Sequence, residues 1–338
     1  MKQNLIETVN EYLSLGINQQ LDYEKFYLYS IITHSTAIEG STVTEIENQL
    51  LFDEGISTNK SMAEQLMNLD LKKAYEQSFI YAKSHADFSI ELLCSLAALV
   101  MQNTGSTYKT IGGDFSSAKG DLRLLNVSAG RGGKSYLAWQ KVPDRLQKFC
   151  DWLNAERKAV DKNDIHKLYE LSFEAHYRIV SIHPWADGNG RMSRLVMNMI
   201  QYEAGCIPSI VKKEKRAEYI QSLAQSQEKD ASNDFIDFMM NHHVDNLQKQ
   251  IDEYKASMES DDIKGGQKIS VGGQKKWSET TLKILELIKQ NPKISRKELC
   301  GELGINPSAV QKHIDKLKET KMIERLGGAK GGEWRVNE

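Results

Sequence analysis

The twelve residues from His183 to Arg194, HPWADGNGRMSR, combine the side chains that are needed to bind and process a phosphorylated ligand. They include a histidine, an aspartate, a Gly-Asn-Gly turn and two arginines three positions apart. Glycine lets the backbone approach a ligand closely, and the free N–H groups at a helix N-terminus bind anions. A purely structural hydrogen-bond network is the alternative, but it would not need all of these features together. The segment therefore predicts an anion site.

Each polar residue of this segment suits a separate task. Arg191 and Arg194 lie on neighbouring faces of the first helical turn, where each guanidinium can bind a phosphate oxygen. Asp187 suits Mg²⁺ that is shared with phosphates. His183 can accept a proton near neutral pH. The backbone that would surround the phosphates belongs to Gly188, Asn189 and Gly190.

The flanking sequence predicts a helix on each side of this site. Apolar residues recur at spacings of three and four over residues 165–181, which is typical of an amphipathic helix. Pro184 disfavours further helix, so His183 should begin a loop. A helix over residues 195–200 would be apolar on most sides, which indicates a buried helix that begins near Arg191; the apolar residues are Leu195, Val196, Met197, Met199 and Ile200.

The segment resembles the signature of Fic-domain proteins, HxFx(D/E)GNGRxxR, at every position but one. Trp185 stands where the family usually has phenylalanine, and either aromatic ring can anchor the loop by packing. The resemblance implies a mainly α fold, a Fic helical core with a small β-hairpin flap. It also implies transfer of AMP from ATP to a Tyr, Ser or Thr hydroxyl of a target protein. His183 would take the hydroxyl proton, Asp187 would hold Mg²⁺, and Arg191 and Arg194 would neutralise the leaving phosphates.

A second motif, Ser35-Thr-Ala-Ile-Glu39-Gly40, resembles the inhibitory motif of the same family, [S/T]xxxE[G/N]. Taken alone, it predicts a helix that a glycine ends, with Glu39 as a solvated carboxylate. In the proteins it resembles, this glutamate pairs with the second arginine of the signature, here Arg194. A carboxylate at that point would repel the γ-phosphate of ATP and occupy its place. The resemblance therefore implies inhibition through Ser35, Glu39 and Gly40.

Residues 101–143 are rich in glycine and contain β-prone runs at 122–127 and 135–139, which together predict a β-hairpin. Gly133-Lys134-Ser135 looks like the end of a Walker A loop. The first glycine of that motif would fall at Ser128, however, and no convincing helix follows, so we reject a Walker A site.

Gly120-Asp-Leu-Arg123 resembles the G-x-Y-R segment that precedes the flap of Fic proteins, with Leu122 in place of the usual aromatic residue. In that family the flap aligns an extended segment of the target protein by strand-type pairing. The resemblance makes the residues from Lys134 to Lys141 the candidates for this pairing.

The C-terminal residues 276–338 resemble a winged helix-turn-helix. Helical spacing predicts three helices, with Ser295 capping the second and Pro307 opening the third, and strands at 323–326 and 333–336 form the wing. The resemblance implies that the third helix enters the major groove of DNA. The candidate DNA contacts are Ser308, Gln311, Lys312, Lys316, Arg325 and Lys330. A winged helix that binds protein or only dimerises stays open.

The charge is distributed unevenly along the chain. The net charge of the 338 residues is −2, whereas residues 276–338 hold ten Lys and three Arg against nine acidic residues, a net charge of +4. The rest of the chain therefore carries −6, and the two parts should meet different partners. The polar, glycine-bearing segment 259–275 has the composition of a linker between them.

We therefore expect four parts, which are a helical region with the inhibitory motif at 1–100, the Fic catalytic core at 101–258, the linker at 259–275 and the winged helix-turn-helix at 276–338.

Several classes of protein are disfavoured by the composition. The four cysteines are isolated, which argues against a zinc site and a disulfide framework. The N-terminus lacks a cleavage site and no apolar run reaches membrane-spanning length, so we expect a cytoplasmic protein without a membrane partner. His176, His242 and His243 have no companion carboxylate or thiol at a spacing that signals a metal or catalytic site, so we interpret them as core or surface residues.

Two other functions remain open at this point. Glu39 could orient a water molecule, so that the same site removes AMP from a modified protein. Alternatively, ATP bound at the site could regulate DNA binding by the C-terminal part. A homodimer that controls inhibition also stays possible.

Overall fold

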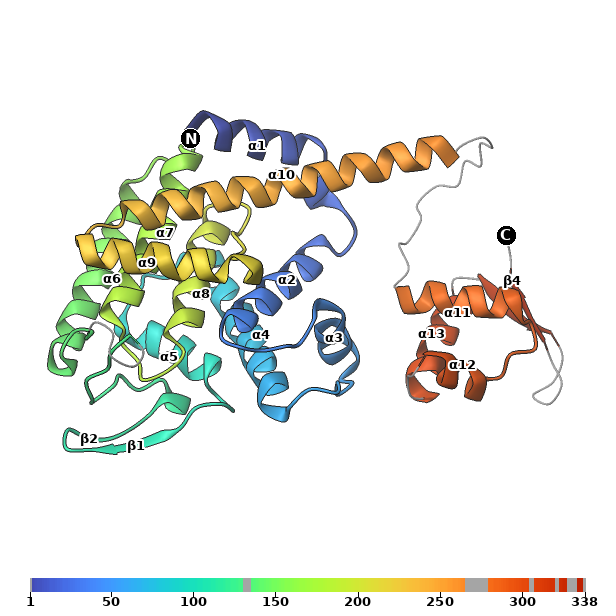
Figure 1. The fold of residues 1–338 in the computed structure, drawn as a ribbon, viewed down its shortest axis with the longest axis horizontal. Coiled ribbons are helices and arrows are strands. Elements are labelled where there is room, and N and C mark those ends of the chain that lie inside the picture. The colour runs from blue at the N-terminus through green and yellow to red at the C-terminus, as the bar shows by residue number, and fades with distance from the viewer. Residues whose placement is uncertain are drawn as a thin grey trace. The chain divides into compact units, whose positions relative to one another are not determined.

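The computed structural model describes residues 2–129, 135–264, 279–303, 307–319, 322–326 and 333–336. The chain divides into two compact units, residues 1–265 and 266–338. The fold is mainly helical, as predicted (Figure 1). The helices of the first unit are α1 (Lys2–Ser14), α2 (Tyr23–Ile38), α3 (Glu45–Gln49), α4 (Met62–Lys83), α5 (Ile90–Val100), α6 (Val142–Ala159), α7 (Ile165–Ile182), α8 (Asn189–Glu203), α9 (Arg216–Lys229) and α10 (Asn233–Lys264).

Helices α7 and α8 lie at the centre of the first unit and pack against each other. The apolar face of α7 and the apolar run of α8 meet α4, α5 and α6 in one buried cluster, which includes Leu71, Leu93, Leu153, Ile179 and Leu195. Both helices that flank the predicted anion site are therefore fixed along most of their length by apolar packing.

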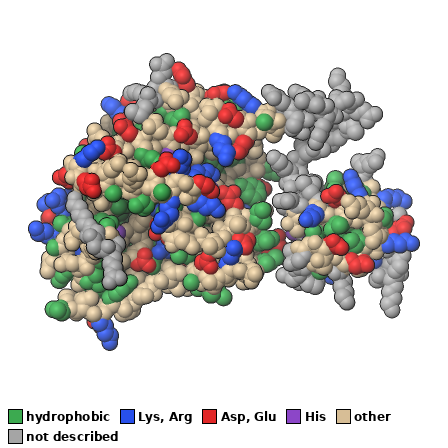
Figure 2. All heavy atoms as spheres, viewed as in Figure 1, with side chains coloured by type: hydrophobic (Ala, Val, Ile, Leu, Met, Phe, Trp, Pro, Cys, Tyr) green, Lys and Arg blue, Asp and Glu red, His purple; other side chains and the backbone are tan. Residues whose placement is uncertain are grey.

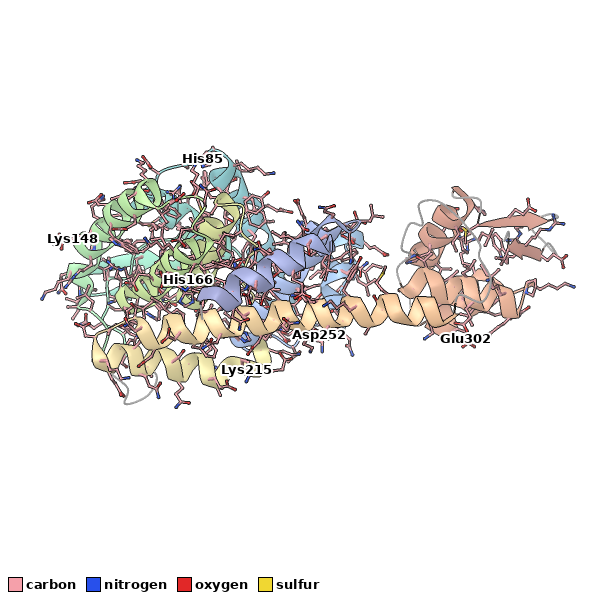
Figure 3. The ribbon with its side chains drawn as sticks, turned by 90° about the horizontal axis from the view of Figure 1, so that it is seen from above. His85, Lys148, His166, Lys215, Asp252 and Glu302 are labelled. Atoms are coloured by element: carbon pink, nitrogen blue, oxygen red, sulfur yellow. The ribbon has the colours of Figure 1, made fainter. Side chains whose placement is uncertain are left out.

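A second buried cluster joins residues from the two ends of this unit. Leu5 and Tyr12 of α1 pack with Phe173 of α7 and with Phe235 and Leu247 of α10. Helix α1 lies alongside α10 in both views of the ribbon (Figures 1 and 3). The N-terminal helices and the segment after residue 100 thus share a hydrophobic core within one compact unit.

The β-hairpin lies earlier in the chain than predicted. Strands β1 (Thr107–Thr110) and β2 (Gly113–Ser116) pair antiparallel, with Thr107 opposite Ser116 and Thr110 opposite Gly113. The runs at 122–127 and 135–139 do not form strands. They approach each other through an isolated bridge between Ser128 and Ser135 and a 3.0 Å bond from the Tyr136 N–H to the Val127 carbonyl.

The runs at 122–127 and 135–139 are held by side chains instead of a ladder. Trp139 N–H donates to the Asn126 side chain at 3.0 Å, and the Arg123 guanidinium bonds to carbonyls of both runs. The β propensity of these residues is therefore overridden by tertiary contacts.

Helix α10 extends through Lys264 and so covers the first part of the segment 259–275 that we expected as a linker. The second unit contains α11 (Glu279–Gln290), α12 (Arg296–Leu303), α13 (Pro307–Glu319), β3 (Ile323–Leu326) and β4 (Glu333–Val336). Strands β3 and β4 pair antiparallel as the predicted wing. Ser295 and Glu298 form reciprocal bonds of 3.2 and 2.7 Å at the start of α12, as the cap prediction requires.

The six candidate DNA contacts are only partly covered by the described residues. Lys330 and the side chains of Ser308, Lys312 and Lys316 lie outside the described part of the structure. Gln311 bonds to Asp315 at 2.7 Å, and the exposed Arg325 lies over the Trp334 ring at 5.0 Å.

Within the described ranges, no helix is both long enough and apolar enough to cross a membrane. On the face shown in Figure 2, acidic and basic side chains intermingle over the first unit.

The shared core predicts that α1 contributes to the stability of the whole first unit. Leu5→Ala should lower the free energy of unfolding by about 2 to 5 kcal/mol, because it removes a fully buried side chain and leaves a cavity. Leu13→Ala on the same helix is the control, since Leu13 is 40% exposed. Urea unfolding of both variants tests this, and equal losses would contradict a shared core.

Candidate active site

The candidate base sits where α7 ends. His183 takes a left-handed backbone conformation (φ 53°) as the C-cap of α7, and its N–H donates to the Ile179 carbonyl at 2.9 Å. Such a conformation is unfavourable for a histidine and must be held by its surroundings.

The side chain and the backbone N–H of Arg123 hold this backbone in place. Its Nε donates to the His183 carbonyl at 2.7 Å, and its own backbone N–H donates to the Pro184 carbonyl at 3.0 Å. The remaining guanidinium nitrogens donate to the carbonyls of Leu125 at 2.8 Å and Leu137 at 2.5 Å. Arg123 is fully buried, so one cation joins the histidine loop to the two runs at 122–127 and 135–139.

Hydrogen bonds between Trp185 and Asn189 close the loop that joins α7 to α8. The Asn189 side chain accepts from the Trp185 N–H at 3.1 Å and donates to the Trp185 carbonyl at 2.8 Å. Trp185 is buried, and its indole N–H donates to the Gly120 carbonyl at 3.2 Å. Gly188 (φ 82°) precedes the helix, which starts at Asn189, two residues earlier than predicted.

His183 is neutral at physiological pH. Burial lowers the pKa of the imidazole to about 4, so the ring can accept a proton. Tyr136 stacks on it, with ring centroids 3.9 Å apart and planes 18° apart. The described part of the segment 135–141 thus reaches the candidate base, while Lys134 lies outside the described residues.

The structure brings Glu39 and Arg194 together across 155 positions of sequence. Glu39 Oε1 accepts from Arg194 Nη2 at 2.6 Å. Ser35 accepts from the same guanidinium twice, through Oγ at 2.8 Å and its carbonyl at 3.0 Å. Burial opposes ionisation of Glu39, but Arg194 outweighs it and holds the pKa of the carboxyl below its usual value. Gly190 allows this approach, because an added Cβ would collide with the Glu39 carboxylate.

Helix α2, which carries Ser35 and Glu39, is itself fixed by buried polar contacts. Thr36 donates to the Asn68 side chain at 2.9 Å, and Asn48 donates to Thr33 at 2.7 Å. At its C-terminus, the Ile38 carbonyl accepts from Arg216 Nε at 2.7 Å. These bonds define the position from which Glu39 reaches Arg194.

Arg191 is oriented differently from Arg194. It is only 3% exposed, and its guanidinium lies beside the Val100 carbonyl at 3.4 Å and the Met101 sulfur at 3.0 Å. Burial lowers the pKa of Arg191, and Asp187 lies 3.7 Å away. Arg191 Nε has no hydrogen-bond partner within the described ranges, so this cation retains capacity for a further acceptor.

Asp187 fits a magnesium ion only if phosphates supply the other ligands. Its side chain is 60% exposed, and one carboxylate oxygen accepts from the Gly188 N–H at 2.6 Å, which leaves the other oxygen for a cation. The described residues contain no cluster of three side chains that could hold a metal by themselves. A single carboxylate together with phosphate oxygens is a usual environment for Mg²⁺.

Comparison with known proteins agrees with this geometry. Residues 87–201 match the Fic/DOC family, and residues 278–324 match the family described as winged helix-turn-helix DNA-binding. The Fic/DOC match is confined to residues 87–201, which include the His183–Arg194 segment and are called the Fic domain below.

Curated relatives of this chain are named protein adenylyltransferases. The protein fic-1 of Caenorhabditis elegans is 27% identical over 241 residues, which cover 70% of this chain and 43% of that protein. Fic of Drosophila melanogaster is 27% identical over 264 residues, covering 75% of this chain and 46% of that protein. The chain thus spans less than half the length of these relatives.

Solved structures with a similar fold include Fic-1 (residues 134–508) of C. elegans, with a TM-score of 0.60, 24% identity, and coverage of 76% of this chain and 72% of that one. A Fic family protein of Desulfovibrio desulfuricans G20 has a TM-score of 0.58 and 17% identity, with coverage of 99% of this chain and 95% of that one. At these identities the likeness supports the fold alone.

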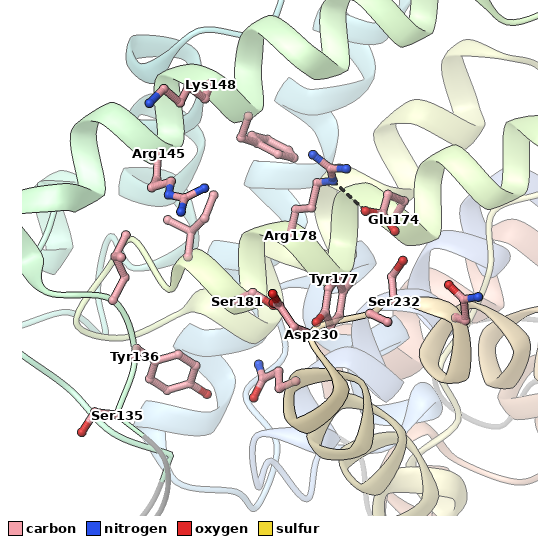
Figure 4. Close-up of a pocket in the computed structure, with 16 residues that line it drawn as sticks. Ser135, Tyr136, Arg145, Lys148, Glu174, Tyr177, Arg178, Ser181, Asp230 and Ser232 are labelled. Carbon is pink, nitrogen blue, oxygen red and sulfur yellow. Dashed lines mark hydrogen bonds and ion pairs between the residues drawn. The ribbon is translucent and has the colours of Figure 1, made fainter.

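A pocket of about 680 Å³ opens on the outer face of α7 in the Fic domain (Figure 4). Tyr136, which stacks on His183, forms one wall, and Tyr177 and Ser181 of α7 form another. Gln227 of α9 and Asn233 of α10 close the far side. The pocket therefore begins next to the candidate base.

Three residues of this site have no motif that marks them in the sequence. Tyr136 and Tyr219 contact His183 and Arg194, respectively, and His176 contacts Tyr219. The sequence predicts a core or surface position for His176. The side chain is fully buried and also contacts Tyr219, which bonds to Arg194. Only proximity in the fold reveals these contacts.

Arg123→Lys should loosen the loop that begins at His183 while preserving the charge. A lysine ammonium group cannot reproduce the planar set of bonds that the guanidinium makes to three carbonyl oxygens. We expect faster hydrogen exchange at the Tyr136 and Arg123 amides, which pair with Val127 and Pro184, and no change in α10. Mass-spectrometric exchange measures this. Arg178→Lys is the control, and unchanged exchange at 123 and 136 would contradict the role of Arg123.

The pKa of His183 gives a second prediction. Its ¹³Cε1 resonance should remain at the neutral position from pH 8 to about pH 5 and titrate near pH 4. Because the folded pKa lies below the usual value of about 6.5, His183 should reduce stability as the pH falls through this window. The His183→Gln variant assigns the resonance. Titration near pH 6.5 would show that burial does not lower the pKa of His183.

Proposed function

We propose that this protein transfers AMP from ATP to a hydroxyl side chain of a target protein. The observation that carries the proposal is the position of His183, a neutral base that directly precedes the anion-binding start of α8. The names of the relatives support the same reaction class. The nucleophile would come from the target, so the site needs no serine or cysteine nucleophile of its own.

The chemistry follows from the groups present. His183 accepts the proton of a target Tyr, Ser or Thr hydroxyl, whose oxygen attacks the α-phosphorus of ATP. The bond from the α-phosphorus to the bridging oxygen breaks, and pyrophosphate leaves. The N–H groups at the start of α8 and the cations Arg191 and Arg194 stabilise the negative charge on the phosphates. Asp187 would hold Mg²⁺, which supplies further neutralisation of phosphate charge when it is bound.

We further propose that the pocket beside Tyr136 accepts the adenosine part of ATP. It combines aromatic walls from Tyr136 and Tyr177 with the amide side chains of Gln227 and Asn233, a lining that suits a heterocyclic base. The target segment would pair with residues around 135–141, of which Tyr136 already makes a strand-type hydrogen bond to Val127.

Glu39 would inhibit this reaction. Its carboxylate lies against Gly190 and holds Arg194, so it occupies space and charge that the γ-phosphate requires. Ser35 supports the same arrangement by accepting from Arg194, and Gly40 (φ 104°) ends α2 just after Glu39.

The reverse activity uses the same residues, and one observation favours testing it. The Glu39 side chain is 34% exposed while it is bound to Arg194, so water can reach the carboxylate. Incubation of an AMP-labelled product with the unmodified protein would reveal release of AMP.

DNA binding is proposed for the second unit, because residues 278–324 match a DNA-binding winged helix family. Gln311 on α13 and Arg325 on β3 are its described candidate contacts. Binding that falls steeply with added salt would support this proposal.

The transferase proposal predicts how labelling depends on Glu39 and His183. With α-labelled ATP and Mg²⁺, the unmodified protein should label itself weakly, Glu39→Gly should increase labelling at least tenfold, and adding His183→Ala should abolish it. Gel autoradiography measures the label. Glu24→Gly, an exposed position on the same helix, is the matched control and should behave like the unmodified protein. Absence of label in Glu39→Gly would refute the transferase proposal.

A further inference from the structure

The partners of Arg194 are divided unequally between two helices. Ser35 lies on α2 and Glu39 is the C-cap of α2, and these two residues make the three shortest contacts of the guanidinium. Among the residues that the structure describes, Tyr219 of α9 is the only other hydrogen-bond partner of the guanidinium, with its hydroxyl 3.3 Å from Nη1. If the contacts from α2 are released, Tyr219 alone continues to hold the guanidinium.

The Tyr219 hydroxyl is held from two sides. Tyr219 is only 2% exposed, so its hydroxyl must find its hydrogen-bond partners within the protein. Its oxygen lies 2.9 Å from Nε2 of His176 and is hydrogen-bonded to that ring. Because a guanidinium can only donate, the same oxygen accepts from Arg194 Nη1.

His176 is held in a fixed position and in the neutral form. It is fully buried and stacks on Phe235 with centroids 4.8 Å apart. Burial, and secondly the charge of Arg194, lower the pKa of His176 well below its usual value, so the ring is neutral. The hydrogen-bond partners of the ring all lie at Nε2, because Nδ1 has none within the described ranges.

The same histidine connects Tyr219 to the anion-binding turn. Ser193 Oγ lies 3.1 Å from His176 Nε2 and 2.9 Å from the Gly190 carbonyl. A chain of contacts thus runs from the first turn of α8 through His176 and Tyr219 back to Arg194 on the second turn. None of its links depends on α2.

We infer that Tyr219, oriented by His176, is a positioning residue that keeps Arg194 directed toward the terminal phosphate once Glu39 has released it. The inference rests on the proposed function, since it assigns Arg194 to the γ-phosphate. It gives Tyr219 a role in specificity, because Arg194 would contact a nucleoside triphosphate but not a monophosphate. Losing the phenol hydroxyl should therefore reduce affinity for triphosphates selectively.

The test compares two nucleotides in the Glu39→Gly protein by titration calorimetry with Mg²⁺. The probes are AMP and α,β-methylene-ATP, whose α–β link cannot be cleaved. Tyr219→Phe should weaken binding of the triphosphate about tenfold and change AMP binding by less than twofold. A general structural defect would weaken the binding of both nucleotides equally. An unchanged ratio of the two affinities would therefore overturn the inference.

Matched variants control for the loss of a buried phenol. Tyr169→Phe removes a buried hydroxyl that donates to the Ile207 carbonyl at 2.8 Å, away from Arg194, and should leave the ratio unchanged. His176→Leu removes the hydrogen-bond partner of the Tyr219 hydroxyl and should reproduce the loss, whereas His176→Gln supplies an amide that can pair with the hydroxyl as donor or acceptor and should restore the ratio. If Tyr219→Phe does not fold, His176→Leu and His176→Gln provide the test instead. An equal ratio of triphosphate to AMP affinity in these two variants would overturn the inference.

Failure of the proposed function would look different. If the Glu39→Gly parent binds α,β-methylene-ATP no more tightly than AMP, Arg194 does not serve the γ-phosphate, and the transferase proposal loses its support together with this inference. If the parent prefers the triphosphate and Tyr219→Phe keeps that preference, only the role of Tyr219 is refuted.

Discussion

The structure depends most on the buried positive charge of Arg194. A guanidinium that is 3% exposed is costly unless acceptors surround it, and removing one partner of a buried ion pair usually destabilises a protein strongly. In this chain the acceptors are Glu39 and Ser35 on α2 and Tyr219 on α9. A phosphate oxygen could replace the Glu39 carboxylate without leaving the cation unpaired. Under the proposed function, the inhibited state and the nucleotide-bound state would both supply an anionic partner for this buried cation.

A second buried cation gives the site its shape. Arg123 forms bonds to the His183 carbonyl and to both runs that approach it, so the base and the segment that would receive a target cannot move independently. The left-handed conformation of His183 is held by this contact and by the bond from the Arg123 N–H to Pro184. Arg123 thus holds the backbone of His183, whereas Arg194 is the cation that the proposed function assigns to the nucleotide.

Much of this could be predicted from the sequence, because the signature and the SxxxEG motif are local patterns. The helix ending near Ser181, the loop at His183 and the wing strands follow from apolar spacing, proline and glycine. The hairpin was placed wrongly, because β propensity does not show that Arg123 and Asn126 hold the runs at 122–127 and 135–139 without a ladder. The Tyr219–His176 contact could not be predicted, since its residues are 43 positions apart and neither belongs to a motif.

The most direct measurement is a crystal structure of the Glu39→Gly chain with α,β-methylene-ATP and Mg²⁺. The account predicts that a γ-phosphate oxygen accepts from Arg194 where Glu39 Oε1 lies now, and that the α-phosphate lies beside His183. A triphosphate that leaves Arg194 without a phosphate contact, or that directs its α-phosphate away from His183, would contradict the central claim.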